Sequence, residues 1–244
     1  MVDHDEYYAE RFAEFYDAWF SMLPDTEGTV ACLAELAGSG PVLELGIGTG
    51  RVALPLQEHG LEVHGVDGSE AMVTQLRAKP GGDGIPVTIG DFSEVPVEGT
   101  FSLVFLASGT FFELPSAEAQ LRCFQNVAKT LAPDGLFVFD SLMPDASRSS
   151  NNQEIRIVPT RGNQLILQCR QYYPHEQRYT SDYVIIRDND VRHMQVKFRY
   201  AWPAELDLMA RFAGLRLRDR WGNWRRGPFT AASTHHVAVY EFPR

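Results

Sequence analysis

The sequence predicts an α/β protein with a doubly wound, mostly parallel sheet, followed by a smaller antiparallel β layer. Three observations support this. Short apolar segments alternate with helical patterns through about the first 140 residues, the first of them ends in a glycine-rich turn, and four later segments alternate apolar and polar residues without helices between them. With 244 residues, 44% of them hydrophobic, the chain can bury a full core as one domain plus an insertion.

The first predicted strand leads into the most informative turn. Residues 42–50 read Val-Leu-Glu-Leu-Gly-Ile-Gly-Thr-Gly, so Glu44 precedes glycines at every second position, namely Gly46, Gly48 and Gly50. Glycine permits positive φ and removes the Cβ atoms that would hold a nucleoside away from the backbone. The turn therefore predicts close approach to a ligand, and a purely conformational role of the glycines is the alternative.

The glycine spacing differs from that of a dinucleotide-binding turn, which runs G-x-G-x-x-G. Here no extra residue precedes the last glycine. Residues 51–57 are predicted to form the following helix, whose first N–H groups face the ligand. The spacing disfavours a nicotinamide-dependent oxidoreductase without excluding it.

Two further strands place acids at the same edge of the sheet. The strand at residues 61–66 ends at Asp67, about 20 residues beyond the glycines, where a ribose-binding acid belongs. Ser69 is the better candidate to cap the next helix, which leaves Asp67 free for a ligand. The strand at 85–89 is followed by Asp91 and Phe92, which would contact an exocyclic amine and an aromatic ring, although a core role for this phenylalanine is equally compatible.

The alternation continues through a fourth and fifth strand. Residues 101–106 are predicted to form a buried strand and residues 118–131 a helix. Residues 132–135 are predicted to end that helix, and residues 136–139 to form the fifth strand. Together these segments complete four β-then-α alternations.

The second half has a different pattern. Its predicted antiparallel strands cover residues 154–158, 164–172, 178–187 and 191–200. Such a meander cannot continue a parallel sheet, so we expect a separate layer over the ligand edge, acting as a lid. A helix at 203–213 and a closing hairpin from strands at 215–221 and 236–242 then return the chain to the core. The predicted division is 1–147 for the cap and core, 148–202 for the insertion and 203–244 for the closing elements.

From about residue 16 to residue 140 the chain resembles the class I S-adenosylmethionine-dependent methyltransferases, which have a Rossmann-like, seven-stranded sheet. The resemblance implies that Ala107 and the two residues after it lie beneath the reactive methyl group, and that Met72 lies against the adenine. It implies S-adenosylmethionine as cofactor and S-adenosylhomocysteine as product. The cofactor-binding positions it implies are Tyr16, Glu44, Gly46, Gly48, Gly50, Asp67, Gly68, Met72, Asp91, Phe92 and Ala107.

The insertion resembles more weakly that of methyltransferases acting on amines of sugars, amino acids and other small metabolites. We therefore expect in-line transfer to a small-molecule amine, driven by alignment and exclusion of water, ahead of C- or O-methylation. A non-catalytic methyltransferase-like scaffold is a further alternative. The candidate catalytic helpers are Tyr16, Asp140, His175, Tyr179 and His193, and for each a surface or core role is the competing interpretation.

The opening segment carries aromatic residues at helical spacing and predicts an N-terminal helical cap. A packed amphipathic helix is the favoured interpretation. A movable cover, with Tyr16 and Asp17 near cofactor and acceptor, is the sharper one.

Charge divides the chain. Residues 1–147 contain 6 Lys and Arg against 23 Asp and Glu, a net −17, whereas residues 148–244 contain 16 against 9, a net +7, summing to −10. A nucleic-acid partner is disfavoured because the catalytic half is acidic. The basic residues either line the acceptor pocket or are solvated strand-edge residues.

The sequence also predicts that a secretory signal, membrane spans, disulfides and a metal site are absent. The N-terminus lacks a secretory pattern, and no apolar run approaches the roughly 18 residues that span a bilayer, so a cytoplasmic protein without membrane association is expected. Cys32, Cys123 and Cys169 are expected to be buried, reduced thiols. No metal is expected, since adjacent His235 and His236 point to opposite faces of a strand. A homodimer is left open.

Overall fold

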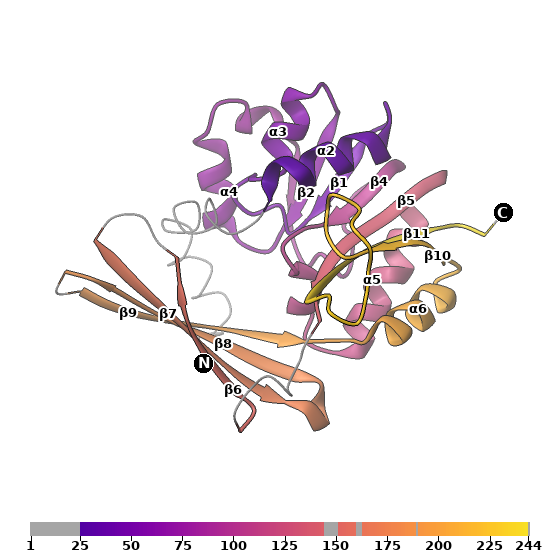
Figure 1. Cartoon of the computed structure of the whole chain (residues 1–244). Coiled ribbons are helices and arrows are strands. Elements are labelled where there is room, and N and C mark those ends of the chain that lie inside the picture. The colour runs from indigo at the N-terminus through magenta and orange to yellow at the C-terminus, as the bar shows by residue number, and fades with distance from the viewer. Residues whose placement is uncertain (1–24, 144–150, 160–162, 189, 244) are drawn as a thin grey trace.

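The computed structural model describes residues 25–143, 151–159, 163–188 and 190–243. Two sheets organise them. Sheet A has seven strands in the order β10-β11-β5-β4-β1-β2-β3, and sheet B has four in the order β6-β7-β8-β9 (Figure 1). The predicted α/β class with a separate antiparallel sheet is confirmed. The predicted N-terminal helical cap and Tyr16 lie outside the described residues, and the domain boundaries stay a prediction.

Sheet A is built from five parallel strands and a closing antiparallel pair. The parallel strands are β1 (Val42–Leu45), β2 (Val63–Asp67), β3 (Val87–Ile89), β4 (Phe101–Leu106) and β5 (Leu131–Leu142). The closing pair is β10 (Arg216–Trp221) and β11 (His235–Glu241), with β11 antiparallel to β5. Because β1 lies between β2 and β4, the order of the chain reverses there, and ligands of such sheets bind outside the carboxyl ends of strands at this reversal.

Helices cover both faces of sheet A. The helices of the described core are α2 (Thr26–Ala37), α3 (Ala53–Glu58), α4 (Glu70–Arg77), α5 (Ala117–Thr130) and α6 (Pro203–Phe212), with 3-10 turns η1 (Gly82–Gly84) and η2 (Thr110–Glu113). One core cluster joins α2, α3 and α4 to one face, and another joins α5 and α6 to the other. Figure 1 shows these two layers above and below the sheet. Stacked aromatic rings of Phe111 and Phe139, 4.4 Å apart, fill the second layer.

Sheet B is a meander that stands beside the core. Its strands are β6 (Gln153–Val158), β7 (Gln164–Tyr173), β8 (Arg178–Arg187) and β9 (Asp190–Arg199), and the turn η4 (Pro174–Glu176) joins β7 to β8. The chain enters it after β5 and leaves it into α6 (Figure 1). At one end Tyr172 and Tyr179 join the core cluster around Phe111, and at the other Val158 and Ile166 pack with Met72 of α4.

Several boundaries differ from those predicted. The helix expected at 51–57 begins at Ala53, because the residues before it close the glycine turn. No helix lies between β3 and β4 among residues 90–100, so the predicted alternation is broken there. The predicted stop at 132–135 is part of β5, where a register shift opposite Phe101 and Leu103 accommodates the extra residues.

The cysteines are reduced, as expected, but not all are buried. Cys32 and Cys123 are buried, whereas Cys169 is half-buried because it points to the face of sheet B that does not pack on the core. No helix in the described part of the chain combines the length and the apolar character needed to cross a bilayer.

Candidate active site

The turn after β1 has the backbone that its glycines predicted. Gly46, Gly48 and Gly50 all have positive φ, at +72°, +54° and +80°. A Cβ on Gly46 would lie 2.6 Å from the Thr110 side chain, and one on Gly50 would lie 2.3 Å from that of Leu76. Gly46 and Gly50 are therefore required by packing as well as by φ.

Gly48 differs from its neighbours because its open side meets no described atom within 4 Å. Its N–H donates to the Asp67 carboxylate at 2.7 Å, across from the end of β2. A side chain at residue 48 would project into the space beyond this turn. The close approach predicted from the glycine spacing therefore has room at Gly48.

Asp67 is less free than the sequence suggested. One carboxylate oxygen accepts the Gly48 N–H and the other accepts the Ser69 N–H at 2.8 Å. Burial raises the pKa of Asp67, while the Ser69 and Gly48 N–H groups lower it. Each oxygen retains a further lone pair, so the carboxylate still has acceptor capacity for a hydroxyl. Ser69 caps α4 as predicted, its hydroxyl accepting the Met72 N–H at 3.2 Å.

Glu44 is a buried acid with an unsatisfied oxygen. It is 4% exposed, and its Oε2 atom has no hydrogen-bond partner among the described residues. Burial raises the pKa of Glu44 to about 8, while the charge of Arg51 lowers it and that of Asp67 raises it. A buried acceptor without a donor costs free energy, typically about 1–3 kcal/mol. Such a group is expected to be completed by a ligand that donates to it.

Arg51 was missed by the sequence analysis. Its guanidinium donates to Thr26 of α2 at 2.8 Å and to Ser108 after β4 at 2.5 Å. Its charge also lowers the pKa values of Glu44 and Asp140. Arg51 thus interacts with residues at the carboxyl ends of β1, β4 and β5. Its place directly after Gly50 was visible in the sequence, but its partners come from distant segments.

Asp140 lies in β5 beside the loop that follows β4. Its carboxylate accepts the Gly109 N–H at 3.3 Å. Burial raises the pKa of Asp140 to about 6, while the Gly109 N–H and the Arg51 charge lower it. A carboxyl group with this pKa can hold or release a proton near neutral pH.

The remaining predicted cofactor positions lie around the same edge. Met72 and Ala107 are each 7% exposed. Asp91 follows β3, and its carboxylate accepts the Ser93 N–H at 2.7 Å. Phe92 is half-buried and packs against the core cluster, as its competing interpretation proposed. Gly68 directly follows Asp67, and the nearest atom to its open side is 3.9 Å away.

The predicted helpers on sheet B are not brought together. Tyr179 is 5% exposed and stacks on Phe198 at 4.7 Å, and burial raises its pKa. The side chain of His175 is 77% exposed and lies 3.1 Å from Glu176. His193 is 61% exposed and lies 2.9 Å from Asp182. His193 and Asp182 belong to the face of sheet B that is opposite Tyr179, so they face away from the core.

Among the described residues, no group of three or more His, Cys, Asp or Glu is arranged to hold a metal.

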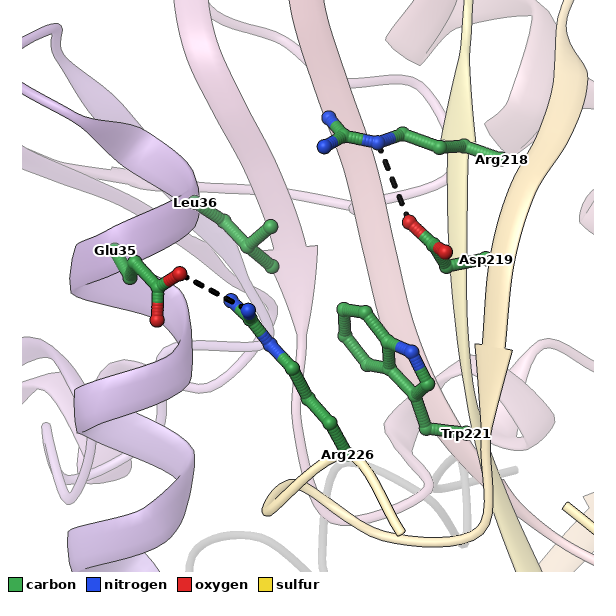
Figure 2. Close-up of a pocket in the computed structure, with 6 residues that line it drawn as sticks. All are labelled: Glu35, Leu36, Arg218, Asp219, Trp221 and Arg226. Carbon is green, nitrogen blue, oxygen red and sulfur yellow. Dashed lines mark hydrogen bonds and ion pairs between the residues drawn. The ribbon is translucent and has the colours of Figure 1, made fainter. Parts of the chain in front are cut away.

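A hollow of about 350 Å³ lies between α2 and β10, apart from this edge. It is lined by Glu35, Leu36, Arg218, Asp219, Trp221 and Arg226 (Figure 2). Its charges pair with one another, Arg226 with Glu35 at 2.9 Å and Arg218 with Asp219 at 3.2 Å.

Comparison with known proteins adds three findings. Residues 42–135 match the family model described as a methyltransferase domain. The CcbJ methyltransferase from Streptomyces caelestis superposes with a TM-score of 0.89 at 36% identity, over 97% of this chain and 98% of that one. The cypemycin N-terminal methyltransferase of Streptomyces sp is 28% identical over 96% of this chain and 97% of its own length.

A more distant structure shows the same fold. The glycopeptide N-methyltransferase MtfA in complex with S-adenosyl-L-methionine has a TM-score of 0.62 at 20% identity, over 91% of this chain and 96% of that one. The full-length matches include sheet B as well as the core.

Proposed function

We propose, since this chain belongs to the class I S-adenosylmethionine-dependent methyltransferases, that it methylates an amine nitrogen of a small natural-product acceptor. The observation that carries the proposal is the likeness to the CcbJ and cypemycin N-terminal methyltransferases over nearly the whole of each chain. The name of the second relative describes it as an N-terminal methyltransferase, which acts on an amine. A match that extends through sheet B supports a related class of acceptor.

The residues at the edge of sheet A fit the cofactor. Glu44 supplies a buried carboxyl oxygen without a partner, which becomes an acceptor when a donating ligand displaces its proton. Gly48 supplies an open approach to the backbone, and Asp67 has remaining lone pairs. When bound, S-adenosylmethionine supplies an electrophilic methyl group on a sulfonium. Glu44, Asp67 and the glycine turn would hold it, with Met72 and Asp91 beside the adenine as the resemblance implies.

Asp140 is the described side chain best suited to handle the acceptor's proton. An amine must lose its proton to attack, and a carboxylate beside it can hold the ammonium and accept that proton. With a pKa raised to about 6, Asp140 is ionised at neutral pH yet more basic than an exposed carboxyl group. It is too weak a base for an ordinary hydroxyl, which favours an amine over O-methylation.

The rest of the catalysis would come from alignment and exclusion of water. Transfer from a sulfonium removes a positive charge, so a dry site that holds acceptor and cofactor in line accelerates it. Sheet B packs at both ends on the core and would cover the edge that carries Asp140. Tyr16, also proposed here as a helper, lies outside the described residues.

The test is methyl transfer to a panel of amines, phenols and indoles from a cofactor with an isotopically labelled methyl group. Mass-spectrometric fragmentation of each product locates the label. Label on nitrogen is expected. Label on oxygen or carbon would replace the proposal with O- or C-methylation, and cofactor binding without transfer to any member would favour a scaffold.

A further inference from the structure

The face of sheet B that packs on the core carries a polar centre between two apolar ends. We call it the inner face: Arg156 of β6, Gln168 and Arg170 of β7, and Ser181 and Tyr183 of β8 are its central residues. The strand register places Arg156 and Tyr183 on either side of Gln168. The ends rest on the core through Val158 and Ile166 at one side and through Tyr172 and Tyr179 at the other. Gln168 and Ser181 of the polar centre are therefore buried against the core, Arg170 and Tyr183 are half-buried, and Arg156 at its margin keeps contact with solvent.

The polar centre has more positive than negative charge. Arg170 lies 3.5 Å from Glu154, its partner across the strand pair. Among the described residues, no carboxylate lies within ion-pair distance of Arg156, whose Nε donates instead to the Gln168 amide oxygen. Burial, and after it the neighbouring charge of Arg170, lowers the pKa of Arg156. Of the carboxylates that the structure describes, Glu154 is thus the one within ion-pair distance of either guanidinium, and the charge of Glu113 in η2 reaches the neighbouring Tyr179 and Tyr183.

Arg170 also has an unused donor. Its Nε atom is buried and has no hydrogen-bond partner in the described part of the chain. The rest of this guanidinium is engaged by Glu154, by a hydrogen bond with Tyr172 and by the Tyr179 ring, 6.0 Å away, so the Nε atom is the donor left for a ligand. A guanidinium pairs best with a carboxylate or a phosphate, to which it can donate two parallel hydrogen bonds.

Gln168 holds the polar centre rigid. It is 1% exposed, and its amide nitrogen donates to the hydroxyls of Ser181 and Tyr183, each at 2.6 Å. Its amide oxygen accepts from Arg156, so its donors and its acceptor are all engaged. The Arg156 guanidinium is therefore oriented before any ligand arrives, which reduces the entropy lost on binding.

The inner face lies by the carboxyl ends of the strands of sheet A, because its two ends contact Met72 of α4, which follows β2, and the cluster around Phe111 of η2, which follows β4. Desolvation lowers the pKa of His235, and the positive charges of Arg170 and Arg156 lower it further, although the ring keeps contact with solvent. His235 is the first residue of β11 and pairs with Leu142, two positions beyond Asp140 in β5. The cations of sheet B and the acid of sheet A thus lie at the same end of the core.

We propose that Arg156 and Arg170 bind an anionic group of the acceptor, a carboxylate or a phosphate, and that the acceptor is therefore an amine that also carries an acid. The opposite charges of the two sheets would orient it, with the ammonium toward Asp140 and the anion toward the arginines. This inference rests on the proposed function only for the identity of the reacting group. The binding of the anion requires no methyl transfer.

The experiment measures binding to full-length protein saturated with S-adenosylhomocysteine, by calorimetry. The probes are matched pairs that differ in one anionic group: amino acids such as phenylalanine against their primary amides, and glucosamine 6-phosphate against glucosamine. We expect the anionic member of at least one series to bind about tenfold more tightly, since a hydrogen bond to a charged group is worth that much. The series that shows the preference distinguishes carboxylate from phosphate.

Variants assign the preference to the arginines. Arg170→Gln and Arg156→Gln should each remove most of the preference for the anionic probe, and Arg170→Lys should retain part of that preference. The control variant Lys197→Gln should retain all of it, because Lys197 lies on the opposite face of sheet B. Unchanged affinity for S-adenosylhomocysteine checks the fold, and if Arg170→Gln fails to fold, the more exposed Arg156→Gln decides. Equal binding of charged and neutral partners by the wild type, or a preference that survives both Gln substitutions, would overturn the inference. If amines are methylated but anionic probes are not preferred, the proposed function stands and the anion site is rejected. If anionic probes are preferred but no amine is methylated, the anion site stands and the proposed function is rejected.

Discussion

Sheet A and sheet B treat their two faces differently. In sheet A, successive residues of β1 are all buried, because helices cover both faces. In sheet B, Ile166 and Gln168 are buried on the inner face, whereas Ile155 and Ile157 on the opposite face are 72% and 68% exposed. One sheet is a closed layer of the core, and the other rests on that core by one side only.

The polar groups differ in the same way. At the edge of sheet A the carboxylates of Asp67, Asp91 and Asp140 accept hydrogen bonds from backbone N–H groups. On sheet B they link side chains to side chains, as around Gln168. Backbone contacts depend on the fold and suit a cofactor shared by a family. Side-chain contacts change with single substitutions and suit an acceptor that differs between relatives.

The largest expected difference between the sheets is in stability. Leu43→Ala removes a fully buried side chain of β1 and should lower the free energy of unfolding by about 2–5 kcal/mol. Leu165→Ala, at a β7 position that is 40% exposed, should cost less than about 1 kcal/mol. Urea denaturation followed by circular dichroism measures both. Similar losses would mean that a second copy or another partner covers the outer face of sheet B.

Glu44→Gln tests whether the buried carboxyl group of Glu44 lowers the stability of the ligand-free protein while it strengthens cofactor binding. Because the pKa of Glu44 is about 8 in the folded chain against 4.5 ordinarily, the folded wild type keeps a proton that the unfolded chain releases. The wild type therefore loses stability as pH rises from about 4.5 to 8, and the variant lacks this loss. Ligand-free variant should exceed wild type by roughly 2–4 kcal/mol at pH 8 and by little at pH 5.

Denaturation of both proteins at the two pH values gives the comparison, and calorimetry should show weaker cofactor binding by the variant. A variant that is less stable than wild type at pH 8 would show that Glu44 is satisfied within the protein.

Asp140→Asn tests whether Asp140 of sheet A, rather than a histidine of sheet B, accepts the proton of the acceptor. If an ionised Asp140 accepts the acceptor's proton, wild-type kcat/KM should rise with pH through about 6, the pKa of this group. The variant should lose about a hundredfold in kcat together with this inflection. His193→Gln, on the outer face of sheet B, should keep both. An inflection that follows His193 instead would reverse the assignment.

The smallest of these effects concerns one methyl group in the glycine turn. Gly48→Ala and Gly60→Ala both place a side chain at positive φ with no described atom within 4 Å, so each should cost about 1 kcal/mol of stability. If the cofactor lies against Gly48, that variant alone should bind it about tenfold less tightly, near 1.4 kcal/mol. Calorimetric titration of both variants with S-adenosylhomocysteine measures this. Equal affinities would move the ligand away from Gly48.

Much of sheet A was predictable because its signals are local. Apolar strands that end in glycine, Asp67 or Asp91 are visible in the sequence, and the carboxyl ends of parallel strands meet at one edge. The register shift in β5 was not predictable, since it depends on how β5 pairs with β4. Nor were the two N–H groups that occupy Asp67, because Gly48 reaches it from another strand.

Sheet B was predictable as strands but not as a surface. Alternation predicted its four strands without indicating which face would meet the core, so Tyr179 and His193 were equal candidates although they lie on opposite faces. The excess of arginine in the second half was visible as well. That Arg156 and Arg170 lie on one face of sheet B, close enough to affect each other and His235, follows only from the pairing and packing of the strands.

The sequence by itself determined the order of strands along the chain, the glycine turn and the family, because φ preferences and hydrophobic periodicity act between near neighbours. Only the tertiary structure decided which charges meet: Arg51 with Glu44 and Asp140, and the arginines of sheet B with the end of sheet A. The strength of an electrostatic interaction depends on distance and burial, and both are set by contacts between segments far apart in the chain.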